Sequence, residues 1–220
     1  MVSIGTNKKE APATMRISEA LDDVLASRGH LRVLRALDAL PEGLGVSARD
    51  LARRAQVAHN RASEVLNSLT QLGLTRVQRA GRADLYQLNR EHVLYPAVHG
   101  LFDQETKVQA ELQRFLRRRL AKLAHVREAF IFGSVARGES RAGSDIDLAL
   151  VMPPSGPTAA EQTELEELAR EVRTRFGSEL GLHVSPQALA RRVEGRAGRA
   201  LWRRIAAEGI RLIPARSENA

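Results

Sequence analysis

The stretch 132-FGSVARGESRAGSDIDLALV-151 places two glycine-containing turns and two aspartates between apolar segments. Residues 126–132 and 145–152 are mainly apolar, and they predict two buried strands that flank the turns. Gly133 and Ser134 end the first predicted strand, and a glycine at this position lets the backbone approach a ligand closely. The free N–H groups of such a turn suit phosphate oxygens, so the stretch predicts a phosphate-binding turn.

Two aspartates begin the second predicted strand, in which alternate side chains point to opposite faces of the sheet. Asp145 and Asp147 therefore share one face, about 6 to 7 Å apart along the strand. Two carboxylates so placed suit Mg²⁺, which usually binds one or two carboxylates together with substrate phosphates. The Ser134 hydroxyl and the Arg137 guanidinium are suited to the same phosphates. The pattern is typical of metal-assisted phosphoryl transfer.

These residues resemble the motif of the DNA polymerase beta-like nucleotidyltransferase superfamily, and in particular of its minimal nucleotidyltransferase branch. The family motif is Gly-Ser, a short spacer that often ends in Ala-Arg-Gly, and then Ser-Asp-Ile-Asp-Leu. The matching positions are Gly133, Ser134, Ala136, Arg137, Gly138, Ser144, Asp145, Ile146, Asp147 and Leu148. The resemblance covers about residues 110–215. It implies a nucleoside triphosphate bound by Gly133, Ser134, Arg137 and Ser144, and Mg²⁺ bound by the catalytic residues Asp145 and Asp147.

The sequence departs from the family at the third catalytic carboxylate. Active members generally carry it on a later strand, which is expected here at residues 179–185. No aspartate lies centrally in that strand, and Glu179 lies too early in it. His183 occupies the expected place, where it is either a structural residue or the catalytic base, since an imidazole can accept a proton in this role. Nucleotide and metal binding are therefore expected, whereas catalytic competence stays open.

After residue 185, two helices and a short terminal strand are expected. Their arginines either steer an RNA or nucleotide substrate or form a solvated helix face; they are Arg191, Arg192, Arg196, Arg199, Arg203 and Arg204. Trp202 is expected to anchor a core or an interface.

A stretch in the first half of the chain is strongly basic. Between Arg28 and Arg82 there are ten arginines against four acidic residues, so this stretch carries +6 of the formal net charge of +8. A basic surface of this kind favours a polyanionic partner, usually nucleic acid. The alternative is a solvated arginine-rich surface, since the whole chain has 30 arginines and 4 lysines.

The same half shows a succession of short elements. Helical spacing of apolar residues predicts a helix over 31–40, a second helix that begins after Ser47 as its N-cap, and a third helix over 58–72. Asp50 lies at the third position of the second helix, as in a capping box. Residues 75–88 predict a hairpin around Ala80 and Gly81.

This order resembles the winged helix-turn-helix family of transcription regulators over about residues 28–90. The resemblance implies a recognition helix at 58–72 in the major groove of DNA. The residues expected to face DNA on this helix are His59, Asn60, Arg61, Ser63, Glu64 and Asn67. Arg79 and Arg82, at the tip of the hairpin, would reach a minor groove or phosphates.

A long helical segment is expected over residues 91–124, in which Pro96 would introduce a kink. Its apolar residues recur every three to four positions, which is consistent with either a connector between domains or the seam of a homodimer. The expected fold class is therefore α+β. Its four parts are a disordered tail (1–15), a winged helix-turn-helix domain (16–90), a connecting or dimerisation helix (91–124) and a nucleotidyltransferase-like mixed sheet flanked by helices (125–215).

Composition excludes several classes of protein. The absence of cysteine excludes disulfides and thiolate metal sites. No run of roughly 18 apolar residues is present, so no membrane helix is expected. The first fifteen residues contain no apolar segment typical of a secretory signal. The expected location is the cytoplasm.

Two functions are consistent with these features. The first is a DNA-binding nucleotidyltransferase that uses Mg²⁺ and an NTP to modify an RNA, a protein or another acceptor. The second is a transcriptional regulator whose nucleotidyltransferase-like domain is catalytically degenerate and senses a nucleotide or binds a partner.

Overall fold

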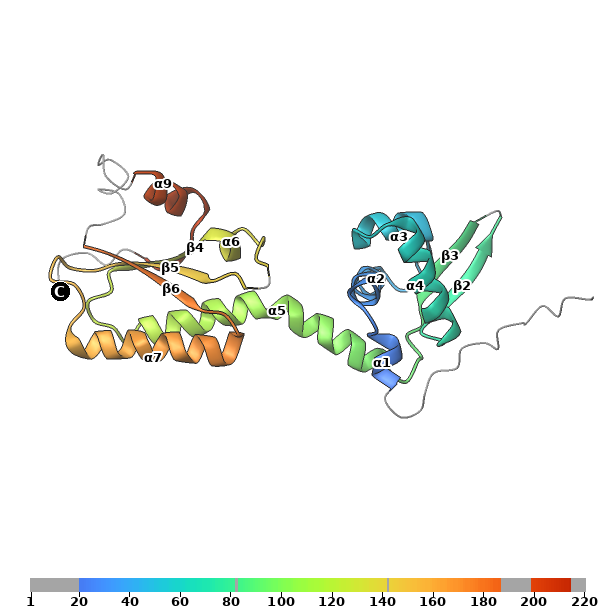
Figure 1. The fold of residues 1–220 in the computed structure, drawn as a ribbon, viewed down its shortest axis with the longest axis horizontal. Helices are drawn as coiled ribbons and strands as arrows, with labels where there is room; N and C mark the ends of the chain where they lie inside the picture. Colours follow the sequence, from blue (N-terminus) through green and yellow to red (C-terminus); the bar gives the residue numbers. More distant parts are fainter. Residues whose placement is uncertain (1–19, 82, 142, 187–198, 215–220) are drawn as a thin grey trace, which may run out of the picture. The chain divides into compact units, whose positions relative to one another are not determined.

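The computed structural model describes residues 20–81, 83–141, 143–186 and 199–214 (Figure 1). The chain divides into two compact units, Met1–Thr106 and Lys107–Ala220. Both contain helices and a sheet, so the α+β class is confirmed. The predicted disordered tail and the first of the two helices expected after residue 185 lie outside the described residues. Among the described helices, none is long and apolar enough to cross a membrane.

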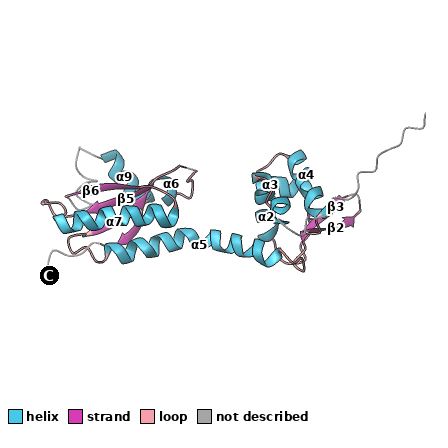
Figure 2. Cartoon of the chain, turned by 60° about the horizontal axis from the view of Figure 1, so that its bottom comes forward, coloured by secondary structure: helices cyan, strands magenta, loops and turns pink. Residues whose placement is uncertain are grey.

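The first unit combines a group of helices with a small antiparallel sheet (Figures 1 and 2). Its elements are α1 (Ala20–Val24), α2 (Arg28–Asp38), β1 (Val46–Ser47), α3 (Ala48–Ala55), α4 (His59–Gln71), β2 (Thr75–Ala80), β3 (Ala83–Leu88) and the start of α5 (Tyr95–Leu120). The strand order is β1-β3-β2. Ala80 pairs with Ala83 at the closed end of the hairpin, where the sequence predicts it. The sequence analysis missed β1, because two residues are too short for a visible alternation.

The helix starts follow from local hydrogen bonds. Ser47 is the N-cap of α3, as predicted, and its Oγ accepts from the Asp50 N–H at 3.2 Å. The Asp50 carboxylate accepts from the Ser47 hydroxyl at 2.7 Å. In a standard capping box the glutamate accepts from the backbone N–H of the cap residue. The shorter Asp50 instead accepts from the hydroxyl of Ser47.

Helix α5 starts later than predicted and contributes to the cores of both units. Pro96 is its second residue, so the predicted kink is wrong: a proline in the first turn lacks an N–H that would be unpaired anyway. Val98 and Phe102 lie in the core of the first unit, whereas Leu112 and later apolar residues lie in the core of the second. Leu101, by contrast, is exposed.

The second unit is a four-stranded mixed sheet flanked by helices, as the sequence predicts. Its elements after α5 are β4 (Glu128–Phe132), α6 (Gly133–Ala136), β5 (Ile146–Val151), α7 (Ala159–Phe176), β6 (Leu180–Ser185), α9 (Arg199–Glu208) and β7 (Ile210–Ile213). The order is β6-β5-β4-β7. Strands β5 and β6 are parallel, and the β4–β5 and β4–β7 pairs are antiparallel.

Alternation along β5 separates two apolar layers. Leu148 and Leu150 pack in one cluster with residues of α5 and α7. Ala149 and Val151 pack in another cluster with Trp202 of α9. In Figure 1, α5 and α7 accordingly lie on one side of this sheet and α9 on the other. The expectation that Trp202 anchors a core is confirmed.

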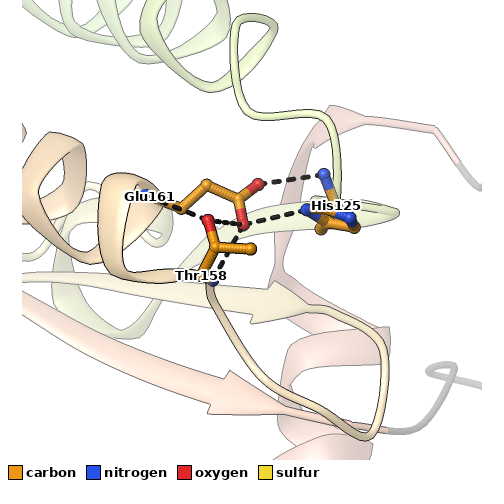
Figure 3. A network of polar contacts seen from close by, with 3 residues as sticks. All are labelled: His125, Thr158 and Glu161. Atoms are coloured by element: carbon orange, nitrogen blue, oxygen red, sulfur yellow. Dashed lines mark hydrogen bonds and ion pairs between the residues drawn. The ribbon is translucent and has the colours of Figure 1, made fainter.

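Helix α7 begins with a capping box that also holds the loop before β4 (Figure 3). The buried Glu161 carboxylate accepts from the N–H and hydroxyl of Thr158, both at 3.0 Å, and from the backbone N–H and Nδ1 of His125 at 3.1 and 3.0 Å. Burial alone would raise the pKa of Glu161, but these hydrogen bonds outweigh it and lower the pKa to about 2.

Candidate nucleotide and metal site

The centre of the site is the contact between Gly133 and Asp147. Phe132, the last residue of β4, pairs with Asp147 of β5, so Gly133 follows directly beside the aspartate. Gly133 has φ +74°. A Cβ at this position would overlap Asp147 Oδ2. Glycine is therefore needed twice here, for its positive φ and for the space that the carboxylate fills.

The two motif aspartates lie at the start of β5. Asp145 is exposed immediately before the strand, and Asp147 is half-buried within it. Asp147 points to the same face as Ala149, the face covered further along by α9. The structure thus confirms the predicted alternation of faces along this strand.

His183 lies next to Asp147 through the parallel pairing of β5 and β6. Gly181 pairs with Asp147, and His183 pairs with Ala149. His183 Nε2 lies 3.8 Å from Asp147 Oδ1, and its ring meets the Phe132 ring edge-on with centroids 5.2 Å apart. A Cβ at Gly181 would lie 3.5 Å from Asp147 Oδ1, in ordinary van der Waals contact with the carboxylate.

The donors at this end of the sheet fit Mg²⁺ only in part. Among the described residues, no group of three His, Cys, Asp or Glu side chains is placed to hold a metal. Glu179, the residue directly before β6, forms an ion pair with Arg173 of α7. The oxygen donors of Asp145 and Asp147 suit a hard cation that takes its other ligands from phosphates and water.

The remaining predicted ligands have partners within the protein. Ser134 is half-buried, and its carbonyl accepts from the Glu139 N–H at 2.8 Å. Ser144 Oγ accepts from the Arg141 N–H at 2.9 Å, which closes the turn before β5. Arg137 donates to Glu139 and Glu208, and these two carboxylates raise its pKa further above the usual arginine value.

Residues 111–193 match the family model for a nucleotidyltransferase domain. Two solved structures resemble the chain. The first is described as a toxin–antitoxin crystal structure with AMP-PNP; it is 20% identical, with 47% of this chain and 74% of that chain covered and a TM-score of 0.34. The second is a mutant of the toxin–antitoxin MntA-HpeT; it is 18% identical, with 49% of this chain and 74% of that chain covered and a TM-score of 0.34. No curated protein matches the sequence.

The matched region contains the whole stretch 132–151, which supports nucleoside monophosphate transfer in general. Sequence reasoning missed two residues beside the motif, Gly181 next to Asp147 and Glu208 next to Arg137. Gly181 carried a usable signal, since a glycine inside a strand often marks a close approach. Glu208 carried none, because it lies 71 residues from Arg137 in the chain.

The residues predicted to bind DNA lie on α4 and β2 of the first unit. His59, Asn60 and Asn67 are exposed on α4, and Ser63 is half-buried. Arg79 is exposed on β2 near the hairpin tip, and Arg82 lies outside the described residues.

Arg61 of α4 already has partners within this unit. It pairs with Glu64 at 3.0 Å and donates to the Ser27 hydroxyl at 2.9 Å. Ser27 caps α2, so this contact joins the starts of the two helices.

Proposed function

We propose that the chain transfers a nucleoside monophosphate from an NTP to an acceptor hydroxyl in its second unit and binds DNA through its first. The observation that carries the enzymatic part is the Asp147 carboxylate seated against Gly133, at the turn expected to hold phosphates. A carboxylate and a phosphate-binding backbone turn in contact are what metal-assisted phosphoryl transfer needs.

In this proposal the turn at Gly133 and Ser134 binds the triphosphate, with Ser144 shaping the loop before β5. The acceptor oxygen forms a bond to the α-phosphorus, the bond from that phosphorus to the bridging oxygen breaks, and pyrophosphate leaves. The acceptor hydroxyl proton passes to His183, whose Nε2 lies on the same side as Asp147. The acceptor is an RNA, a protein or a small molecule.

Asp145 and Asp147 would hold the Mg²⁺. When bound, the ion would neutralise the negative charge of the phosphates. The half-buried Asp147 lies beside Gly133, where a side chain would overlap its Oδ2, and within 3.8 Å of His183 Nε2.

The DNA-binding part is supported by the element order of the first unit. Two helices, α3 and α4, precede a two-stranded hairpin, which is the arrangement of a winged helix-turn-helix. The exposed polar residues of α4 would contact bases, and Arg79 would contact phosphates. A homodimer through α5 stays a prediction, supported by the exposure of Leu101 and Val108, seven residues apart.

One observation favours a second function. Among the described residues no third carboxylate joins Asp145 and Asp147. A regulator that senses a nucleotide through a catalytically degenerate domain needs the first two carboxylates but no base.

Calorimetry with Mg²⁺ and each of the four NTPs tests the proposal. The wild-type protein should bind at least one of them, and the variant with Asp145→Asn and Asp147→Asn should bind none while keeping its fold. Equal binding by both proteins would refute the metal site. Labelled NTP with a cell lysate then separates the two functions: an enzyme labels an acceptor and His183→Ala loses turnover with binding retained, whereas a sensor labels nothing.

A further inference from the structure

Arg137 links the turn after β4 to the last residue of α9. Its Nε donates to Glu139 at 2.8 Å and its Nη1 donates to Glu208 at 2.9 Å. Glu208 ends α9, whose Trp202 packs on the sheet face to which Asp147 belongs. The motif arginine therefore connects the nucleotide-binding turn to the helix that covers the same face.

The end of α9 also packs closely against β4, the strand that leads into the turn. Gly209, next to Glu208, has no room for a side chain, because a Cβ would overlap the α9 backbone and lie 3.5 Å from the Ile131 carbonyl oxygen. Ile131 lies on β4 two residues before Gly133. The end of α9 thus packs against the end of β4. Arg137, at the end of the turn after β4, binds Glu208 at this same end of α9.

The charges argue against Arg137 as a phosphate ligand. One guanidinium shared by two carboxylates gives the group a net charge of −1, so it offers phosphates no attraction. A nucleotide that used Arg137 would have to displace both carboxylates and then lie beside them. A nucleotide that binds the backbone N–H groups at the start of the turn would displace neither carboxylate from Arg137.

We propose that Arg137 is a positioning residue: with Glu208 it holds the turn at Gly133 in its nucleotide-binding conformation and does not contact the phosphates. This inference rests on the proposed nucleotide binding. The two roles predict opposite signs for one substitution. If Arg137 binds phosphate, removing Glu208 frees the guanidinium and tightens nucleotide binding. If the Arg137–Glu208 pair holds the turn, removing Glu208 loosens the turn and weakens nucleotide binding.

The test is calorimetry of the full chain with Mg²⁺ and each NTP. Glu208→Ala should weaken binding roughly 3- to 10-fold. Its thermal midpoint should stay that of the wild type, because exposed ion pairs contribute little to stability. The exchanged pair, Arg137→Glu with Glu208→Arg, should restore affinity. Glu164→Ala is the control, since it removes the same charge from an ion pair between Glu164 of α7 and Arg119 of α5. Unchanged or tighter binding by Glu208→Ala, or no restoration by the exchanged pair, would overturn the proposal.

Hydrogen exchange of the nucleotide-free protein separates this inference from the proposed function. The N–H groups of Arg137, Gly138 and Glu139 donate within the turn at 3.3, 3.2 and 2.8 Å. They should exchange faster in Glu208→Ala and at the wild-type rate in Glu164→Ala. If the wild type binds no nucleotide, the proposed function fails and exchange alone decides: unchanged rates in Glu208→Ala would overturn the positioning role.

Discussion

Single residues decide the geometry of both the candidate site and the support behind it. Gly133 leaves the space that the Asp147 carboxylate occupies. Glu161 is buried, yet its four hydrogen bonds keep it charged and join α7 to the loop before β4. The role of each of these two residues depends on one group of contacts, so a single substitution tests each role.

Gly133→Ala should abolish Mg²⁺-dependent nucleotide binding, because the added Cβ displaces Asp147. The positive φ adds a stability cost of about 1–2 kcal/mol. Gly156→Ala is the matched control: it has φ +71° but no atom near the added Cβ. Both variants should lose similar stability in urea unfolding, and only the first should lose binding. Nucleotide binding retained by Gly133→Ala would contradict the assigned geometry.

Glu161→Gln should destabilise the protein at pH 7 by about 1–2 kcal/mol, because an amide NH₂ must then face one of the donors. The folded pKa of about 2 lies below the usual 4.5, so the carboxylate's contribution is present above pH 4.5 and is lost as the pH falls toward 2. The difference between wild type and variant in the free energy of unfolding should therefore shrink at pH 3.

Glu166→Gln, on the same helix, is the control for this experiment, since Glu166 is exposed and bonds to Gln162. It should change stability little at either pH. An equal difference between wild type and Glu161→Gln at pH 7 and pH 3 would refute the ionised carboxylate as the stabilising group.

At the scale of elements, the start of α5 belongs to the first unit. Val98 and Phe102 are buried against its helices. Arg35 of α2 donates to both oxygens of Glu105 at 2.6 and 2.9 Å, and Asp38 contacts His99 at 3.0 Å. The Arg35–Glu105 ion pair is exposed and contributes little, so the apolar burial of Val98 and Phe102 is the main force that holds the helix in place.

Phe102→Ala should therefore destabilise the first unit by about 3–5 kcal/mol. Val93→Ala, at an exposed position before α5, should change stability by less than about 0.5 kcal/mol. Urea unfolding followed by circular dichroism measures the loss. The single tryptophan, Trp202, is buried in the second unit, and its fluorescence should keep the wild-type midpoint in both variants. Equal effects of Phe102→Ala and Val93→Ala would contradict the packing of α5 on the first unit.

At the scale of the whole molecule, each of the two units has its own apolar core. Within the first unit, the stretch from Arg28 to Arg82 carries a net charge of +6. The exposed arginines Arg76 and Arg79 of β2 present part of this charge to solvent. A polyanion is the partner that such a surface attracts.

The full chain should bind duplex DNA with an affinity that falls steeply with salt, because arginines that neutralise phosphates release counterions. Arg79→Ala should weaken binding to all sequences and reduce the salt slope by about 1, whereas Asn60→Ala should change which sequence is preferred. Fluorescence anisotropy on several duplexes at a series of salt concentrations measures both effects. Absence of binding even at low salt would refute the DNA-binding function.

The sequence by itself determined the features that depend on neighbours in the chain. Ser47 as a cap, the hairpin at Ala80 and the faces of β5 follow from spacing and side-chain chemistry within a few residues. The mixed sheet was expected only from the resemblance to nucleotidyltransferases. The motif of 132–151 likewise predicted nucleotidyltransferase chemistry, and a match over residues 111–193 supports that class.

Only the tertiary structure decided which distant side chains meet. It brought His183 to Asp147 through the pairing of β5 with β6, and Glu208 to Arg137 across the end of α9. It also divided α5 between two cores, which its uniform apolar spacing did not reveal. These outcomes depend on strand order and helix packing between residues far apart in sequence, where local periodicity carries no information.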